Sequence, residues 1–366
     1  MTTEMALGQP PSPGRAVVVG TGLIGGSVGM ALRRLGWHVT GWDLDAERAE
    51  LALELGALDA VGEDPDAVVT FVATPVRAVA DQALKALAGG PGLVTDVGSV
   101  KSPIVEAVAD ARFVGGHPMA GSEQDGVEGA SSDLFEGATW VLTPTAGTDV
   151  AAYAQVRQLV GAFGAEVLAL PPEHHDALVA VVSHVPHLTA ATLMRLAAGR
   201  GQEHGVLLRL AAGGFRDMTR IAGGSPAIWP DICGENRSAI VDVLDELLAA
   251  LGTMRAVVAN GDRAALLDLL EEARAARVNL PVHIGAPEDL RELRVPVPDR
   301  PGVIADVTTL ATELGVNLVD VEIAHSSEGL RGVLILLVEA DAVPRLRQGL
   351  ADKGYRSSVH PVDALQ

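Results

Sequence analysis

The chain has 366 residues, of which 48% are hydrophobic, and a formal net charge of −20. This length and hydrophobic content predict two or three globular domains and exclude a disordered chain. The acidic balance argues against nucleic acid and anionic membrane surfaces as partners, and no apolar stretch predicts a transmembrane helix. The single cysteine, Cys233, excludes an internal disulfide framework and favours a reducing, cytoplasmic compartment.

The first predicted elements surround a glycine-rich turn. An apolar run over 16–19 predicts a buried strand, the sequence GTGLIG follows, a helix is expected over 27–35 and a second strand over 37–42. Gly20 permits the tight turn, Gly22 lets the backbone approach a pyrophosphate, and Gly25 lets helix and strand pack closely. With an acid at the end of the second strand, this order predicts a dinucleotide site.

Two parts of this signature predict how the cofactor binds. Free N–H groups at the start of the helix hold the phosphates. The acid, Asp43, accepts hydrogen bonds from the adenosine ribose and repels a 2′-phosphate, which favours NAD over NADP. The alternative is a glycine turn that binds no ligand. The expected cofactor-binding residues are Gly20, Gly22, Leu23, Ile24, Gly25, Asp43, Thr74 and Ser99.

Strands and helices alternate as far as about residue 170, which predicts a Rossmann-type, doubly wound parallel sheet. Ligands of such sheets bind at the carboxyl ends of the strands. Thr74, the stretch 96–99 and His117 all follow predicted strands, so we expect them to converge on one crevice. Further strands are expected over 67–74, 92–97, 113–116 and 139–143, and helices over 76–88 and 102–109.

The rest of the chain predicts two more domains. Residues 172–281 are rich in Ala and Leu at helical spacing, which predicts an all-helical substrate and dimerisation domain. A leucine stripe there packs either inside the domain or against a second copy, and by analogy with other NAD enzymes we favour a homodimer. After a linker over 282–291, residues 292–366 show βαββαβ order. The first domain is thus expected over 14–171, after a tail over 1–13. The leucine stripe consists of Leu244, Leu247, Leu248 and Leu251. In the last domain, strands are expected over 293–297, 318–324, 332–338 and 355–361, and helices over 302–314 and 342–352.

Several stretches contain more polar residues than a core needs: DVGSVK from residue 96, GHPMAGSE from residue 116, SHVPH from residue 183 and FRDMTR from residue 215. With these stretches and TRIA over 219–222, nearly the whole chain resembles the prephenate/arogenate dehydrogenases of tyrosine biosynthesis. The segment from Asp299, DRPGVIADVTTLATELGVNLVDVEIAHS, resembles an ACT domain, a regulatory module that commonly binds amino acids.

The resemblance implies oxidative decarboxylation of prephenate to 4-hydroxyphenylpyruvate with NAD. Hydride leaves ring C4 and the ring carboxylate leaves as CO2. The nearest alternative is the same chemistry on arogenate, which yields tyrosine. A hydroxy-acid dehydrogenase is a more distant alternative, and a non-catalytic amino-acid sensor that keeps the nucleotide fold is another.

This chemistry requires an acceptor for the C4 hydroxyl, cations for two carboxylates and a dry crevice. By resemblance His117 is the catalytic histidine, since a neutral imidazole accepts a hydrogen bond at working pH. Ser99 is expected to bond the same hydroxyl or the nicotinamide side. Its other possible role, which is compatible with the first, is to cap the helix that starts near Ser102.

The expected substrate contacts lie mostly in the helical domain. Arg220 clamps a carboxylate with paired donors. Ser183 and His187, four residues apart on one helix face, line the prephenate pocket by resemblance. The acids Glu123 and Asp217 are expected to orient His and Arg side chains or to gate the cleft.

Other polar residues keep several interpretations. Lys101 either favours an anionic ligand or is a solvated surface charge. We reject a metal site at the pair His174–His175, because adjacent histidines on a helix point in different directions. Trp229 is expected to pack the loop after Arg220. In the ACT-like region we expect an amino-acid site, with tyrosine as the natural ligand, formed by Asp299, Arg300, Pro301, Gly302 and Asn317. The alternative is that this region is a purely structural appendage.

Overall fold

The structure is a computed structural model that describes residues 12–121, 124, 126–203, 211–278, 290–298, 302–325 and 331–361. The chain forms two compact units, Met1–Gly252 and Thr253–Gln366, and each is described by itself. Nearly all of the expected tail over 1–13 and most of the expected linker over 282–291 lie outside the described residues.

The first unit contains an eight-stranded sheet in the order β3-β2-β1-β4-β5-β6-β7-β8. The predicted Rossmann-type sheet is confirmed, and its neighbouring strands are parallel except for β6 and β7, which pair antiparallel. Parallel neighbours need a crossover, usually a helix. The described part of the β6–β7 connection contains only the 3-10 turn η1 (Val127–Gly129). The strands are β1 (Arg15–Val19), β2 (His38–Trp42), β3 (Ala60–Val61), β4 (Val69–Val72), β5 (Leu93–Asp96), β6 (Phe113–Pro118), β7 (Thr139–Thr143) and β8 (Glu166–Ala169).

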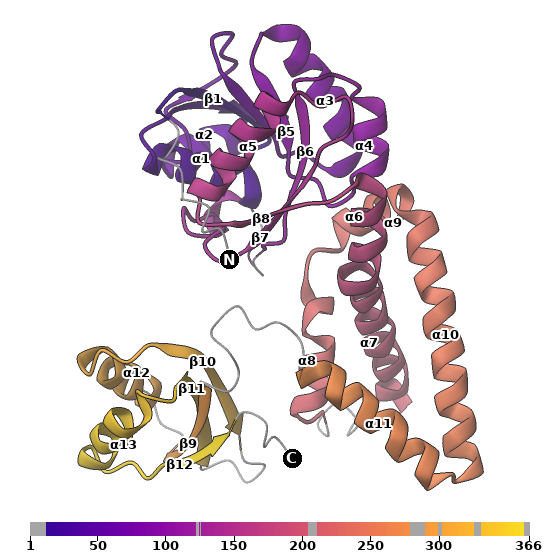
Figure 1. Ribbon diagram of the computed structural model, residues 1–366, viewed down its shortest axis with the longest axis vertical. Helices are drawn as coiled ribbons and strands as arrows, with labels where there is room; N and C mark the ends of the chain where they lie inside the picture. The colour runs from indigo at the N-terminus through magenta and orange to yellow at the C-terminus, as the bar shows by residue number, and fades with distance from the viewer. Residues whose placement is uncertain are drawn as a thin grey trace, which may run out of the picture. The chain divides into compact units, whose positions relative to one another are not determined.

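Helices cover both faces of this sheet (Figure 1). Side chains of α1 (Leu23–Arg34), α2 (Ala46–Glu54) and α5 (Val150–Ala162) share one core with Val18 and Phe71. Side chains of α3 (Val76–Gly89) and α4 (Ser102–Ala107) share another core with Val72 and Val94. Successive residues of a buried strand point to opposite faces of the sheet, so the side chains of neighbours such as Phe71 and Val72 pack into different cores.

A helical region follows the sheet. Its small core contains Ala180 and Ile240, and Leu244 and Leu247 pack against it. Leu248 and Leu251 are 64% and 53% exposed, so the leucine stripe is divided between core and surface. The elements are α6 (Pro172–Val179), the π-helical turn η2 (Ala180–His184), α7 (Val185–Glu203), α8 (Gly213–Thr219), the 3-10 turns η4 (Arg220–Gly223) and η5 (Pro226–Ile228), α9 (Trp229–Glu235) and α10 (Arg237–Asn260).

One helical run of the described chain, Pro172–Arg200, is long and apolar enough to span a membrane by length and composition alone, a feature that core helices of soluble proteins also show. It includes the π-turn, which the sequence did not predict. Inside the run, His184 is buried and lies 3.2 Å from the side-chain amide of Asn236.

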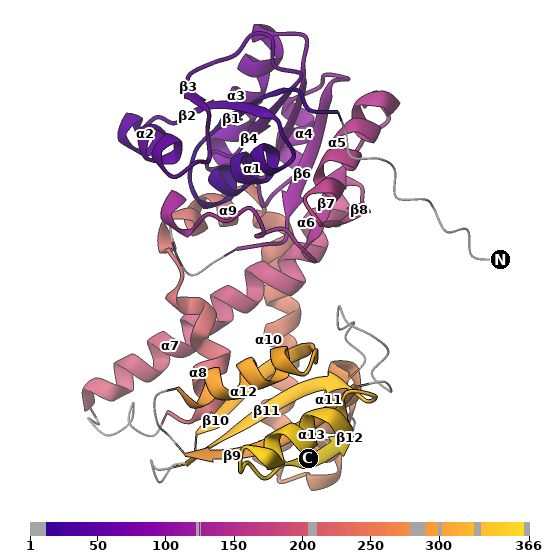
Figure 2. The same ribbon diagram turned by 90° about the vertical axis from the view of Figure 1, so that its left-hand side faces the viewer.

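The second unit begins in α10, continues with α11 (Arg263–Val278) and ends in a four-stranded antiparallel sheet of order β10-β11-β9-β12. The predicted βαββαβ order is confirmed. Both helices of this motif contribute to one core on a single face of the sheet (Figure 2). β9 begins at Leu290, so the last two residues of the expected linker belong to the sheet. The elements are β9 (Leu290–Pro298), α12 (Val303–Glu313), β10 (Leu318–His325), β11 (Arg331–Glu339), α13 (Val343–Asp352) and β12 (Ser358–Pro361).

Candidate active site

The glycine-rich turn between β1 and α1 has the geometry of a dinucleotide site. Gly20 has a φ of +91°, and a Cβ there would lie 2.5 Å from the Ala73 carbonyl oxygen. A Cβ at Gly25 would overlap the carbonyl oxygen of Gly20. At Gly22 a Cβ would meet no described atom within 4 Å, and Gly22 caps α1 without a side-chain hydrogen bond. Gly20 and Gly25 are therefore required by the turn, and Gly22 leaves room for a phosphate.

Asp43 lies directly after β2 and beside this turn. Its Oδ2 accepts a hydrogen bond from the Thr21 N–H at 2.8 Å, and its side chain is 11% exposed. A carboxylate held here is in the place where a Rossmann fold binds the adenosine ribose. Thr74 follows β4, and its buried hydroxyl has no hydrogen-bond partner in the described part of the protein. An orphaned hydroxyl at a strand end fits a site that hydrogen-bonds a ligand.

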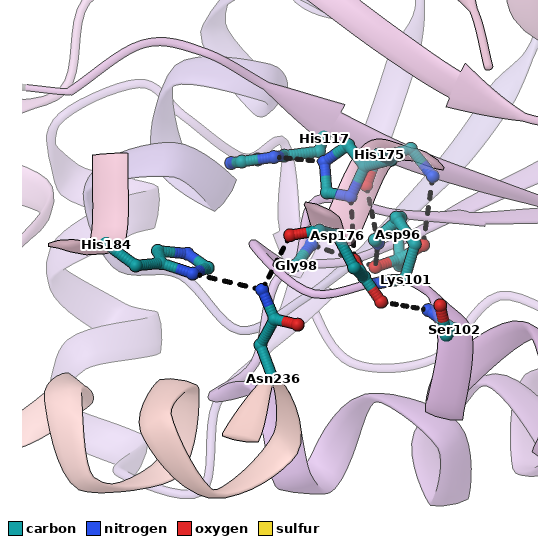
Figure 3. A network of polar contacts seen from close by, with 10 residues as sticks. Asp96, Gly98, Lys101, Ser102, His117, His175, Asp176, His184 and Asn236 are labelled. Atoms are coloured by element: carbon teal, nitrogen blue, oxygen red, sulfur yellow. Dashed lines mark hydrogen bonds and ion pairs between the residues drawn. The ribbon is translucent and has the colours of Figure 1, made fainter. Parts of the chain in front are cut away.

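His117 lies on β6 at the end of a polar network (Figure 3). Its Nδ1 is 2.8 Å from Nε2 of His175, and the Nδ1 of His175 is 2.8 Å from Oδ1 of Asp176. The two rings meet edge to face, with centroids 5.1 Å apart. His175 and Asp176 come from α6, so the helical region supplies the hydrogen-bond partners of the predicted catalytic residue.

Asp176 also holds the start of α4. It accepts the backbone N–H groups of Lys101 at 2.7 Å and Ser102 at 2.8 Å. The side-chain amide of Asn236 donates to the Asp176 carbonyl oxygen at 2.8 Å. The capping alternative for Ser99 is therefore wrong: Lys101 is the N-cap residue, no side chain of its own caps the helix, and Asp176 performs that task from another element.

A buried ion pair fixes the backbone just before His117. Lys101 and Asp96 are fully buried and paired. Asp96 accepts the Gly116 N–H at 3.0 Å, and the Lys101 ammonium donates to the Gly116 carbonyl at 2.7 Å. The surface interpretation of Lys101 is wrong, because the side chain is fully buried and its ammonium bonds Asp96 and the Gly116 carbonyl.

The electrostatic environment keeps His117 and His184 neutral. Burial lowers the pKa of His117 well below 6.5, and nearby His175, Lys101 and His184 lower it further. Burial lowers the pKa of His184 to about 4. Burial alone would raise the pKa of Asp176, but hydrogen bonds led by the one from His175 outweigh it and hold that pKa below its usual value. The Asp176 carboxylate is thus ionised, whereas His117 and His184 are neutral.

One of the predicted substrate residues, His187, contacts Trp229. The ring of His187 stacks on Trp229 with centroids 3.7 Å apart and planes 15° apart, a contact that the sequence did not predict. Ser183 is half-buried in the π-turn, an element often found at functional sites. Arg220 is exposed at the start of η4, and Asp217 is exposed on α8.

Some predicted residues lie outside the described residues: Glu123, Asp299, Arg300 and Pro301. Of the expected regulatory residues, Gly302 caps α12 with a φ of +91°, and Asn317 precedes β10. Within the described ranges no group of three or more His, Cys, Asp and Glu side chains is placed to hold a metal ion. His175 is buried, whereas its neighbour His174 is exposed.

Sequence reasoning missed the partners of His117. The only local signal for them is the pattern His175–Asp176 near the start of an apolar helix, where charged side chains are costly unless they are hydrogen-bonded. Nothing in the pattern shows that the two residues meet α4 and β6.

A nucleotide turn and a neutral histidine at strand ends of one sheet define the class of the protein, an NAD-dependent oxidoreductase. Two family models match: the prephenate dehydrogenase nucleotide-binding domain over residues 28–169 and the prephenate dehydrogenase dimerization domain over 171–272. The chain is 35% identical to the prephenate dehydrogenase of Bacillus subtilis over 341 residues, which are 89% of this chain and 92% of that protein. The chain belongs to the prephenate dehydrogenase family.

Solved structures agree with this assignment. The crystal structure of Aquifex aeolicus prephenate dehydrogenase with hydroxyphenyl propionate and NAD+ is 31% identical, with a TM-score of 0.70, over 75% of this chain and 100% of that chain. The structure of Synechocystis arogenate dehydrogenase is 32% identical, with a TM-score of 0.63, over 72% of this chain and 98% of that chain.

Proposed function

We propose that this chain catalyses the NAD-dependent oxidative decarboxylation of prephenate to 4-hydroxyphenylpyruvate, with His117 as the catalytic residue. The observation that carries the proposal is the neutral His117 ring at a strand end of the nucleotide-binding sheet, held through one nitrogen. Family membership over most of the chain supports it.

His117 acts on the C4 hydroxyl of the substrate. Because His175 engages Nδ1, the second ring nitrogen, Nε2, accepts the hydroxyl proton as the C4–O bond becomes a carbonyl. NAD, when bound, would supply the acceptor for the hydride of C4. Loss of CO2 then returns an electron pair to the ring, and His117 gives the proton back to the phenol oxygen. The ring becomes aromatic, and no net proton is consumed.

The remaining site residues bind and orient. Ser99 hydrogen-bonds the same hydroxyl or the nicotinamide, and Arg220 clamps a substrate carboxylate. His187, stacked on Trp229, lines the pocket with Ser183. Asp217, together with Glu123, orients the basic side chains or gates the cleft. The pyrophosphate of the cofactor is held by Gly20, Gly22, Leu23, Ile24 and Gly25. The adenosine ribose is held by Asp43, and the crevice is bordered by Thr74 and Ser99.

Regulation and assembly complete the proposal. The C-terminal sheet acts as an ACT-like module that binds tyrosine at 299–302 and Asn317 and thereby inhibits the enzyme. Its βαββαβ order supports this assignment. The chain forms a homodimer through the helical region, where apolar side chains such as Val182, Leu196 and Leu248 are exposed. Its single cysteine favours a cytoplasmic location.

The absorbance of the reduced nicotinamide, measured for each combination of substrate and cofactor, tests this function. Prephenate and arogenate are each supplied with NAD or NADP, with and without tyrosine. We expect turnover of prephenate with NAD and its inhibition by tyrosine. If only arogenate is turned over, the substrate is arogenate and not prephenate. If neither compound is turned over, the proposed reaction is refuted.

A further inference from the structure

A chain of hydrogen bonds behind His117 fixes where its ring proton sits. The Asp176 carboxylate can only accept, so the proton of the 2.8 Å contact belongs to Nδ1 of His175. When His175 is neutral, this is its one N–H, so its Nε2 accepts. The 2.8 Å contact to His117 then takes its proton from Nδ1 of His117, and Nε2 of His117 keeps a lone pair.

Asp176 is well placed to set this direction. Its two oxygens also accept the N–H groups of Lys101 and Ser102, and its own carbonyl is held by Asn236. These bonds leave the carboxylate little freedom to turn away from His175, which is itself 0% exposed. Donors on every side also favour the ionised form of the carboxylate.

The tautomer matters for the reaction. With its proton on Nδ1, His117 presents an acceptor to the substrate hydroxyl. With the proton on Nε2, the ring would present a donor and could not take the hydroxyl proton. The two forms of a free imidazole differ little in energy, so the neighbouring groups decide between them.

We propose that His175 and Asp176 are positioning residues that hold His117 in the tautomer with a free Nε2, an inference that rests on the proposed function of His117. Neither residue needs to touch substrate or cofactor. The helical region thus contributes to the reaction through its contact with β6 as well as through its predicted substrate contacts.

Variants at His175 test this proposal. His175→Leu removes both hydrogen bonds and keeps an apolar side chain in the buried position. His175→Gln keeps one donor and one acceptor at a spacing close to that of the two ring nitrogens. The matched control is His174→Leu, at the exposed neighbouring position.

Steady-state kinetics gives the first readout. For His175→Leu we expect kcat to fall on the order of 100-fold, within the range that a correctly protonated general base contributes. KM for prephenate and the Kd for NAD should change less than threefold, which is about 0.65 kcal/mol. His175→Gln should recover most of kcat, and His174→Leu should match the wild type.

The second readout is the 15N spectrum of histidine side chains in the full-length protein without ligands. The chain has 10 histidines, so the His117 signals can be assigned by their loss in His117→Asn. We expect a protonated Nδ1 and an unprotonated Nε2 in the wild type, and a mixture of both tautomers in His175→Leu. Folding of each variant is checked by its thermal transition.

The possible outcomes separate the two proposals. An unchanged His117 tautomer in a folded His175→Leu, or a kcat within threefold of the wild type, would overturn the positioning role. A wild type that does not turn over prephenate would overturn the proposed function, while the tautomer measurement would still decide the role of His175.

Discussion

At His117, burial and neighbouring positive charge act in the same direction. Both disfavour the imidazolium, so the pKa lies well below 6.5 and the ring is neutral across the physiological range. A neutral base is competent without losing a proton to solvent first.

The pH dependence of kcat/KM should show this. Protonation of His117 removes the acceptor, so kcat/KM for prephenate should fall as pH decreases, and the midpoint should lie well below pH 6.5. His117→Asn should lower kcat by about 10²- to 10⁴-fold and leave NAD binding intact. Initial rates with freshly diluted prephenate measure both effects. A midpoint at or above pH 6.5 would contradict the neutral ring.

Asp43 offers a second prediction at the scale of one side chain. Asp43→Ser should lower the ratio of kcat/KM with NAD to that with NADP by at least about tenfold, because a hydrogen bond to a charged group contributes about 1.5–3 kcal/mol. Glu47→Gln, which changes an exposed acid at the start of α2, is the control. An unchanged ratio in Asp43→Ser would place the ribose contact on another residue.

At the scale of elements, the end of β6 depends on side chains from β5 and the start of α4. β5 and β6 pair only at Val94–Phe113 and Thr95–Val114, and beyond these pairs the Asp96–Lys101 ion pair bonds the Gly116 backbone. Side-chain hydrogen bonds thus replace the backbone hydrogen bonds between β5 and β6 beyond the last paired residues.

Lys101→Met should therefore be costly. It leaves the Asp96 carboxylate buried without its cation, and breaking a buried pair in this way costs about 3–5 kcal/mol of unfolding free energy. Urea unfolding measures the loss, and Lys85→Met, at an exposed position on α3, is the control. If Lys101→Met were as stable as the wild type, the ammonium would not be needed to compensate Asp96. The double variant Asp96→Asn with Lys101→Met should recover part of the loss, since neither position of the pair then carries a buried charge.

The elements themselves could largely be predicted from sequence. The apolar runs place β7 at Thr139–Thr143 and α3 within one residue, because strand and helix periodicity are local properties. The π-turn could not be predicted, since one extra residue in a helical turn leaves the apolar pattern almost unchanged. Nor could the polar network be predicted, because Lys101 and Asp176 are 75 residues apart in the chain and meet only in the folded protein.

At the scale of the whole molecule, a shorter relative in the same family serves as a comparison. All of the Aquifex aeolicus chain is covered by 75% of this one, so a chain without its C-terminal sheet is a reasonable catalytic unit. Because β9 begins at Leu290, the cut belongs before that residue.

A chain of residues 1–289 should keep kcat for prephenate within about threefold and lose inhibition by tyrosine. NADH formation with and without tyrosine measures both effects, and sedimentation shows whether the dimer survives. Retained inhibition would place the tyrosine site outside the βαββαβ unit. Loss of activity together with dissociation would show that this unit holds the subunits together.

The reversal of strand direction between β6 and β7 has a consequence for how this enzyme can change. The glycine turn follows β1 and Asp43 follows the neighbouring strand β2, whereas His117 lies where β6 leaves β5 and pairs with β7. In the proposed mechanism, cofactor choice and hydroxyl chemistry therefore depend on separate strand pairs with separate supporting residues. We therefore expect that the preference for NAD can be redesigned at Asp43 without disturbing the proposed acceptor, His117.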